Sequence, residues 1–147
     1  MSATPRSAET SDLPGIATLL DAVWADLDQP IAHSAEELAE EFDSTATSLA
    51  DVMVWESDNG DLSAVGYTLL LAGDDLARCY LFGGVHPEAR HHGIGTELID
   101  HLIARASERL RALSSRRLVM RTHRPSTSTA AANILSARGF TGARYFT

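Results

Sequence analysis

The sequence contains no lysine: all 12 of its basic residues are arginines, against 20 acidic residues and a net charge of −8. A Walker-type phosphate loop needs a lysine after its last glycine, so this chain has no such loop. The acidic balance also argues against nucleic acid as a partner, because phosphate backbones are bound by basic surfaces. An acidic surface can instead draw a cationic amine inward, or it can serve solubility alone.

Cysteine is almost absent as well. Cys79 is the only one, which excludes an internal disulfide and fits the reducing cytoplasm, where we expect the protein to work. It stands in an apolar segment and is expected to be a core residue. No apolar run approaches the length of a membrane span, and the first residues lack the apolar core of a signal peptide, so we expect no membrane partner. No metal is expected either, because the adjacent His91 and His92 diverge and no His-Glu-x-x-His motif occurs.

The length of 147 residues and an apolar content of 44% fit a single globular domain over residues 1–147. Hydrophobic periodicity and turn signals predict helices and strands in a mixed order. The strands fall at about 1–9, 52–55, 62–72, 76–85, 118–123 and from 140, and the helices at about 10–24, 34–42, 94–113 and 129–138. Asn59-Gly60 marks a hairpin between two of the strands, and a turn at 73–75 adds the third strand of a meander. Ser34 is predicted to cap the second helix. One face of the third helix is apolar, with Ile94, Leu98, Leu102, Ala106, Leu110 and Leu113. The predicted class is α+β, a mixed, mostly antiparallel twisted sheet flanked by helices.

The most informative segment runs from Val85 to Leu98, where a strand ends in a turn and a helix begins at once. The turn carries Arg90-x-x-Gly93-x-Gly95. First-turn N–H groups have no partner within a helix, and the helix dipole favours an anion, so this turn is predicted to hold a phosphate-bearing ligand. A dinucleotide fingerprint does not fit, because its third glycine position is Leu98. A glycine-rich turn that only reverses the chain is the simpler alternative.

This segment resembles the acetyl-CoA-binding signature of the GNAT N-acetyltransferase superfamily. The segment Ala130–Phe140, which ends in Gly139-Phe140, is similar to the last helix of that family. The resemblance implies a GNAT-like sheet with the cofactor in a cleft between splayed strands, and acetyl-CoA as the co-substrate. It assigns contacts with the cofactor to Gly83, Gly84, Val85, Arg90, His91, His92, Gly93, Ile94, Gly95, Thr96 and Ser128.

Gly83-Gly84 interrupts the strand that precedes the turn. Glycine weakens a strand unless it marks a bulge or a close approach. By resemblance, this strand exposes backbone groups to the acyl arm of the cofactor; a structural bulge without ligand contact is the alternative.

The groups that move protons are harder to assign. Transfer to an amine needs a base for the amine proton and an acid for the leaving thiolate. His123 at a strand end is a candidate base, and Tyr80 or Tyr145 a candidate acid. Many family members carry a tyrosine in the last helix where this chain has Leu135, and some use a carboxylate that the strand 76–85 lacks. His86, just before Pro87, is expected to order the turn.

Three functions therefore stay open. The first is an acetyl-CoA-dependent N-acetyltransferase that acts on a primary amine of a small molecule or a protein N-terminus by direct attack. The second is an acyl-CoA-binding GNAT-like module with weak or no activity. The third is an unrelated α+β protein with a nucleotide or phosphate ligand. The chain also ends sooner after Gly139-Phe140 than family members do. It is therefore expected to correspond to one half of a tandem protein, or to form a homodimer that completes its last strand.

Overall fold

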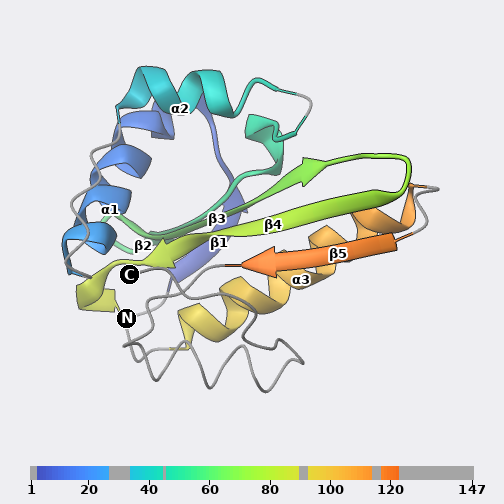
Figure 1. The fold of residues 1–147 in the computed structure, drawn as a ribbon. Helices are drawn as coiled ribbons and strands as arrows, with labels where there is room; N and C mark the ends of the chain where they lie inside the picture. The colour runs from blue at the N-terminus through green and yellow to red at the C-terminus, as the bar shows by residue number, and fades with distance from the viewer. Residues whose placement is uncertain (1–2, 27–33, 45, 90–92, 114–116, 123–147) are drawn as a thin grey trace.

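A computed structural model describes residues 3–26, 34–44, 46–89, 93–113 and 117–122. Five strands form one open sheet in chain order (Figure 1). The first four strands pair antiparallel, and the fifth pairs parallel to the fourth. The mixed, mostly antiparallel sheet predicted from the sequence is confirmed. The strands are β1 Ala3–Ser7, β2 Met53–Ser57, β3 Leu62–Leu71, β4 Leu76–Val85 and β5 Arg117–Thr122.

Helices cover both faces of this sheet. In Figure 1, α1 and α2 lie above it and α3 lies below it. Three short 3₁₀ turns connect these elements, at Thr10–Asp12, Leu49–Asp51 and Pro87–Ala89. No helix in the described part of the chain is long and apolar enough to cross a membrane. The helices are α1 Leu13–Asp26, α2 Ala35–Glu41 and α3 Ile94–Arg111.

The sheet separates two hydrophobic cores because successive strand residues point to opposite faces. Val65 and Tyr67 of β3 belong to the core under α1 and α2, whereas Ala64 belongs to the core under α3. Gly66 also faces α3: a Cβ at this position would lie 2.3 Å from Leu98 Cδ1. The absence of a side chain there lets α3 sit close to the sheet.

The predicted apolar face of the third helix is confirmed. Five of its residues are buried against the sheet: Ile94, Leu98, Leu102, Ala106 and Leu110. Cys79 is buried in the same core, where desolvation raises the pKa of its thiol, so it is a packing residue as expected.

Two local predictions are also confirmed. Ser34 caps α2, since its hydroxyl oxygen accepts a hydrogen bond from the Glu37 N–H at 3.1 Å. Asn59-Gly60 lies in the turn between β2 and β3, where the Gly60 N–H donates to the Ser57 carbonyl at 2.9 Å. The predicted helix 129–138 and the strand from 140 lie outside the described residues.

Candidate functional site

The site lies at the end of β4, beyond the part of this strand that is paired with β5 among the described residues. The parallel register starts at Leu76–Arg117 and ends at Leu81–Thr122, whereas β4 continues to Val85. On its other side β4 stays paired with β3 as far as Val85, which lies opposite Ala64. The last four residues of β4 therefore have a neighbouring strand on one side only, within the described part of the chain.

The hydrogen-bond alternation of β4 shows which backbone groups face this gap. The His86 N–H donates to the Ser63 carbonyl at 2.8 Å, so residues 63 and 86 stand at a hydrogen-bonded position of the antiparallel ladder. In an antiparallel ladder, bonded and non-bonded pairs alternate. By that alternation the N–H and C=O groups of Gly83 and Val85 point away from β3. The carbonyl of Leu81 shows the same direction, because it accepts a hydrogen bond from the Thr122 hydroxyl of β5 at 3.1 Å.

The two strand glycines are close-approach positions. The bulge alternative is wrong, because the β3–β4 register runs without a shift through both glycines. Gly83 has a φ of 152°, and a Cβ there would lie 2.2 Å from the Val65 carbonyl oxygen. A Cβ on Gly84 would lie 2.8 Å from Val23 Cγ1 of α1. Neighbouring protein atoms thus explain why both positions hold glycine.

The N-terminus of α3 lies directly beside the end of β4. Gly93 is the N-cap with a φ of 83°, and its carbonyl accepts the first helical hydrogen bond from the Glu97 N–H at 3.2 Å. The N–H groups of the intervening first turn therefore have no acceptor within the helix. Among the described residues, a Cβ on Gly93 would meet nothing within 4 Å, and one on Gly95 would lie 3.9 Å from Val85 Cγ2.

Two side chains in this region, those of Glu97 and His86, already form hydrogen bonds. Glu97 carries the acidic group of the first turn, and its carboxylate accepts a hydrogen bond from Trp55 Nε1 at 3.1 Å. His86 Nδ1 accepts a hydrogen bond from the Glu88 N–H at 3.1 Å, so it orders the turn as expected. A nitrogen that accepts this bond carries no proton, which leaves the other ring nitrogen as the donor.

The structure thus brings together one part of the predicted site. Strand residues Gly83–Val85 and helix residues Gly93–Thr96 lie near one corner of the sheet, since a Cβ added to Gly95 would stand 3.9 Å from Val85 Cγ2. Arg90, His91 and His92 of the cradle lie outside the described residues, as do His123 and Ser128.

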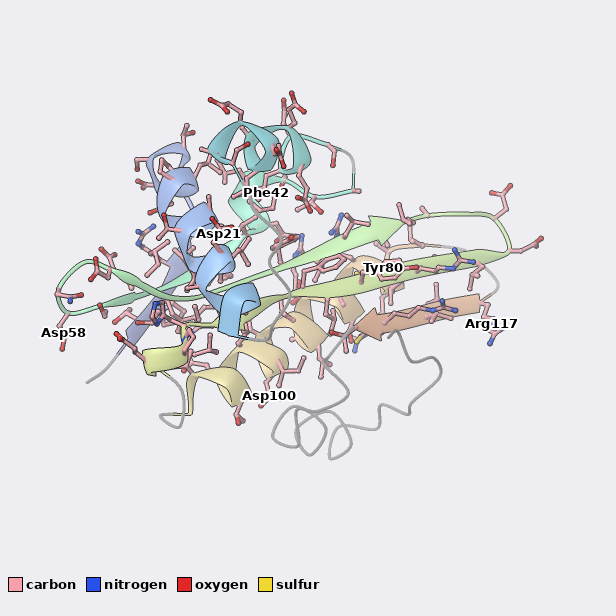
Figure 2. All side chains as sticks on the ribbon, turned by 60° about the vertical axis from the view of Figure 1, so that its left-hand side comes forward. Asp21, Phe42, Asp58, Tyr80, Asp100 and Arg117 are labelled. Atoms are coloured by element: carbon pink, nitrogen blue, oxygen red, sulfur yellow. The ribbon has the colours of Figure 1, made fainter. Side chains whose placement is uncertain are left out.

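Tyr80 lies apart from this corner. Its position on β4 is opposite Leu69 and Arg121, and its ring stacks on Phe82 with centroids 6.2 Å apart. Figure 2 shows its side chain on β4, away from the N-terminal end of α3. The candidate acid is thus partly exposed on the face that α1 and α2 share.

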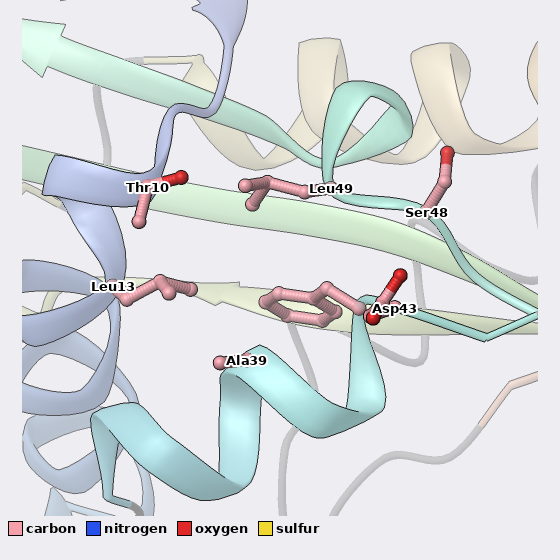
Figure 3. A pocket seen from close by; sticks show the side chains of 7 residues that line it. Thr10, Leu13, Ala39, Asp43, Ser48 and Leu49 are labelled. Atoms are coloured by element: carbon pink, nitrogen blue, oxygen red, sulfur yellow. The ribbon is translucent and has the colours of Figure 1, made fainter.

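A separate pocket of about 320 Å³ lies between the start of α1 and the end of α2 (Figure 3). Most of its lining residues are apolar, and Asp43 adds a carboxylate. None of its residues comes from β4 or α3, so it is distinct from the corner described above. The lining residues are Thr10, Leu13, Ala39, Phe42, Asp43, Ser48 and Leu49.

Sequence reasoning missed two features of this region. The first is Gly66, which lets α3 lie close to the sheet. The only sign of this in the sequence is a glycine inside a strand. The second is a hydrogen bond from the Tyr67 hydroxyl to the Glu41 carboxylate at 3.2 Å. These two residues are 26 positions apart in different elements, so no local pattern links them.

Both the sequence and the fold of this chain are similar to those of known proteins. Residues 16–140 match the sequence profile described as the acetyltransferase (GNAT) family. No curated protein matches the chain.

Several solved structures share the fold. A GCN5-related N-acetyltransferase from Sphaerobacter thermophilus aligns with a TM-score of 0.74 and 22% identity, over 95% of this chain and 43% of that one. This chain therefore spans less than half of that protein. A phosphinothricin acetyltransferase from Sinorhizobium meliloti, in complex with acetyl-CoA, aligns at 0.64 and 21% identity, over 95% and 75% of the two chains.

A third structure is an aminoglycoside acetyltransferase from an uncultured soil metagenomic sample, in complex with sisomicin. It aligns with a TM-score of 0.65 and 15% identity, over 99% of this chain and 92% of that one. At these identities the likeness establishes the fold.

Proposed function

This chain belongs to the GNAT acetyltransferase family, and from that premise we propose that it transfers an acetyl group from acetyl-CoA to a primary amine. Acetyl transfer is the general activity that family membership supports. The proposal adds the amine acceptor, of a small molecule or a protein N-terminus, and direct attack on the thioester. We further propose that residues 1–147 act as a single domain in the cytoplasm.

One observation carries the proposal: within the described residues, backbone groups of β4 that lack a partner strand lie beside the N-terminus of α3. The first-turn N–H groups of α3 suit the pyrophosphate of acetyl-CoA, because they have no acceptor within the helix and the helix dipole favours an anion. The open space at Gly93 leaves room for such a ligand. Arg90, His91, His92, Ile94 and Thr96 are proposed to complete the cradle, with Ser128 contacting the cofactor from the last helix.

The outward groups of Gly83 and Val85 suit the acyl arm. An N–H group aimed at the thioester carbonyl oxygen stabilises the charge that develops there when the amine nitrogen attacks. The C–N bond forms as the C–S bond breaks, the amine proton goes to a base and the thiolate takes a proton from an acid. His123 and Tyr80 remain our candidates for these two roles.

The silent acyl-CoA-binding module is the second candidate function. Its supporting observation is that β4 carries no carboxylate between Leu76 and Val85, and that the position of the family tyrosine is Leu135. Such a module would bind acetyl-CoA at the same corner and release no thiol in the presence of amines.

Calorimetric titration of acetyl-CoA into the wild type and Gly95→Asp tests the cradle. The added carboxylate stands in the first turn of α3, where it favours the helix but repels phosphate. We expect acetyl-CoA binding to be lost while the melting temperature is unchanged or higher. Ala104→Asp is the matched control, because it adds the same charge at an exposed position of α3 beyond the first turn.

Release of free thiol with a panel of amines then separates the two candidate functions. Turnover identifies an enzyme, and binding without turnover identifies the silent module. If the wild type does not bind acetyl-CoA, both candidates are wrong.

Assembly with a second domain or a second copy remains part of the proposal. The S. thermophilus structure extends well beyond the part that this chain matches. Sedimentation equilibrium of the purified chain distinguishes a homodimer from a monomer.

A further inference from the structure

Three arginine side chains lie together on the sheet face opposite α3. Cys79 of β4 and Met120 of β5 pack in the core under α3, so the residues next to them in each strand point to the other face. Arg78 of β4 is one of these, and the parallel register aligns it midway between Arg117 and Arg121 of β5. The three positions are therefore neighbours on one side of the sheet.

This part of the sheet lies beyond the described helices that cover the same face. In Figure 1, the hairpin end of β3 and β4, together with β5, extends past α1 and α2, and α3 lies below. Leu71 of β3, directly opposite Arg78, is accordingly 48% exposed. Arg117 and Arg121 are exposed as well, whereas Arg78 is partly buried. We call these four residues the arginine face.

The arginine face carries positive charge without a countercharge. Among the described residues, its three guanidinium groups form no ion pair or hydrogen bond, and Arg78 Nε is shielded from solvent without an acceptor. By contrast, Arg6 Nη1 lies 2.8 Å from Asp12 Oδ2, and Arg105 Nε lies 2.7 Å from Asp51 Oδ1. Like charges on neighbouring positions repel one another, so the arginine face favours an acidic partner.

The same chain carries an acidic surface of matching size on α2. Glu36, Glu37 and Glu40 are exposed, while Leu38 of the same helix is buried in the core. Residues three and four positions apart are neighbours on a helix, so Glu40 lies beside both of the others. Their carboxylates form no ion pair with another described residue. Figure 2 shows carboxylate side chains standing on the outer side of α2.

We infer that the arginine face binds α2 of a second copy of this chain. Because α1 and α2 cover one part of the sheet face and leave the neighbouring part open, the helices of a second copy can fill the open part. A two-fold axis between the copies forms this contact twice, with each α2 on the arginine face of the other copy. Guanidinium groups donate paired hydrogen bonds to carboxylates, and Leu71 adds an apolar contact. This assembly does not depend on the proposed acetyl transfer.

Sedimentation equilibrium of the full chain tests the contact through its charges. We expect the wild type to dimerise in about 50 mM salt, and its dissociation constant to rise at least about tenfold in about 500 mM salt, because dissolved ions screen exposed charge pairs. In low salt, Arg117→Glu with Arg121→Glu should raise the dissociation constant at least about tenfold, and so should Glu37→Arg with Glu40→Arg. All four residues are exposed, so the melting temperature should change little.

A mixture of the two double variants gives the sharpest result. In the mixed dimer, one contact joins two unaltered surfaces and the other joins two reversed ones, so both contacts again pair opposite charges. The dissociation constant should return to within about threefold of the wild-type value. A chain with all four reversals should dimerise too, and its net charge is still −8, which separates the contact from the overall charge.

Arg111→Glu is the matched control for the arginine face. It reverses an exposed arginine at the end of α3, on the other side of the sheet, and should leave the dissociation constant unchanged. If a reversal disturbs folding, Arg117→Gln with Arg121→Gln removes the two charges without adding any, and it should weaken the dimer as well.

Three results would overturn the docking of α2 on the arginine face. They are a wild type that stays monomeric, a dimer that both double variants leave unchanged, and a mixture that does not recover. A dimer that ignores both sets of reversals would use another surface, such as the last strand.

Discussion

The two glycine pairs near the candidate site look alike in sequence but serve different purposes in the structure. Gly83 and Gly84 of β4 face protein atoms, since an added Cβ would lie 2.2 Å from a β3 carbonyl oxygen or 2.8 Å from a side chain of α1. Gly93 and Gly95 at the start of α3 face open space or an ordinary contact. Internal packing accounts for the first pair, and only the second pair leaves room for a ligand.

Substitutions in the two glycine pairs therefore report on different properties of the protein. A variant of Gly83 that loses activity reports on folding, because the protein itself leaves no room for a side chain. A variant of Gly95 that loses binding reports on the ligand, because the protein does leave room. Four glycine-to-alanine substitutions test this contrast, and the one with the greatest predicted change in the free energy of unfolding comes first.

Gly83→Ala should have the largest effect. The new methyl group would overlap the Val65 carbonyl, and the φ of 152° is unfavourable for alanine. Overpacking and backbone strain together should cost about 4 kcal/mol in the free energy of unfolding. Urea denaturation measures it, and a loss below about 1 kcal/mol would show that β4 and β3 can separate at this point.

Gly84→Ala should cost less, because its neighbour is a side chain. The methyl group would press on Val23 Cγ1, and overpacking of this kind costs about 2 kcal/mol. Val23→Ala removes the opposing methyl groups, so the double variant should be more stable than the sum of the single effects predicts. A double-mutant cycle with a coupling energy near zero would contradict the direct contact.

Gly93→Ala should have a smaller effect on stability. No atom lies within 4 Å of the new Cβ, so the cost comes from the left-handed backbone alone, about 1 kcal/mol. Gly93→Asn should cost less, because asparagine tolerates this conformation better. Thermal unfolding of both variants measures the difference; a larger loss for asparagine than for alanine would indicate a steric cause.

Gly95→Ala should have the smallest effect, of opposite sign. The residue is helical, and its added methyl group makes an ordinary contact with Val85. Alanine should therefore stabilise the protein by about 0.5 kcal/mol through its better helix propensity. If this variant is stabilised but binds acetyl-CoA more weakly, the glycine serves the ligand. Destabilisation would instead show that packing requires a glycine here, as it does at Gly83 and Gly84.

Much of the fold followed from local patterns. The apolar repeat of α3, the Ser34 cap of α2 and the Asn59-Gly60 turn each lie within a few neighbouring residues, and all three are confirmed. The three-strand meander followed from the two turn sequences at 58–61 and 73–75. Such features depend on backbone propensity and on which side of an element is apolar, and both are readable along the chain.

The candidate site was predictable only in part, for a physical reason. The turn at Gly93 and Gly95 could be recognised because a turn that leads into a helix is built from consecutive residues, and its binding of phosphate stays a prediction. The alternative of a bulge at Gly83-Gly84 was wrong. The sequence could not show this, because the atoms that require glycine there belong to Val65 and Val23, which are distant in sequence. Close approach between segments leaves no local pattern.

The sequence by itself thus determined the helices and strands that are confirmed, the glycine turn that precedes α3 and the acidic, lysine-free composition. Only the tertiary structure decided that, within the described residues, β4 stays paired with β3 beyond its pairing with β5, that the start of α3 lies beside Val85, and that Glu41 meets Tyr67. Periodicity along one segment specifies which side of it is apolar. The distance between two segments depends on side chains from both, and it exists only once the chain has folded.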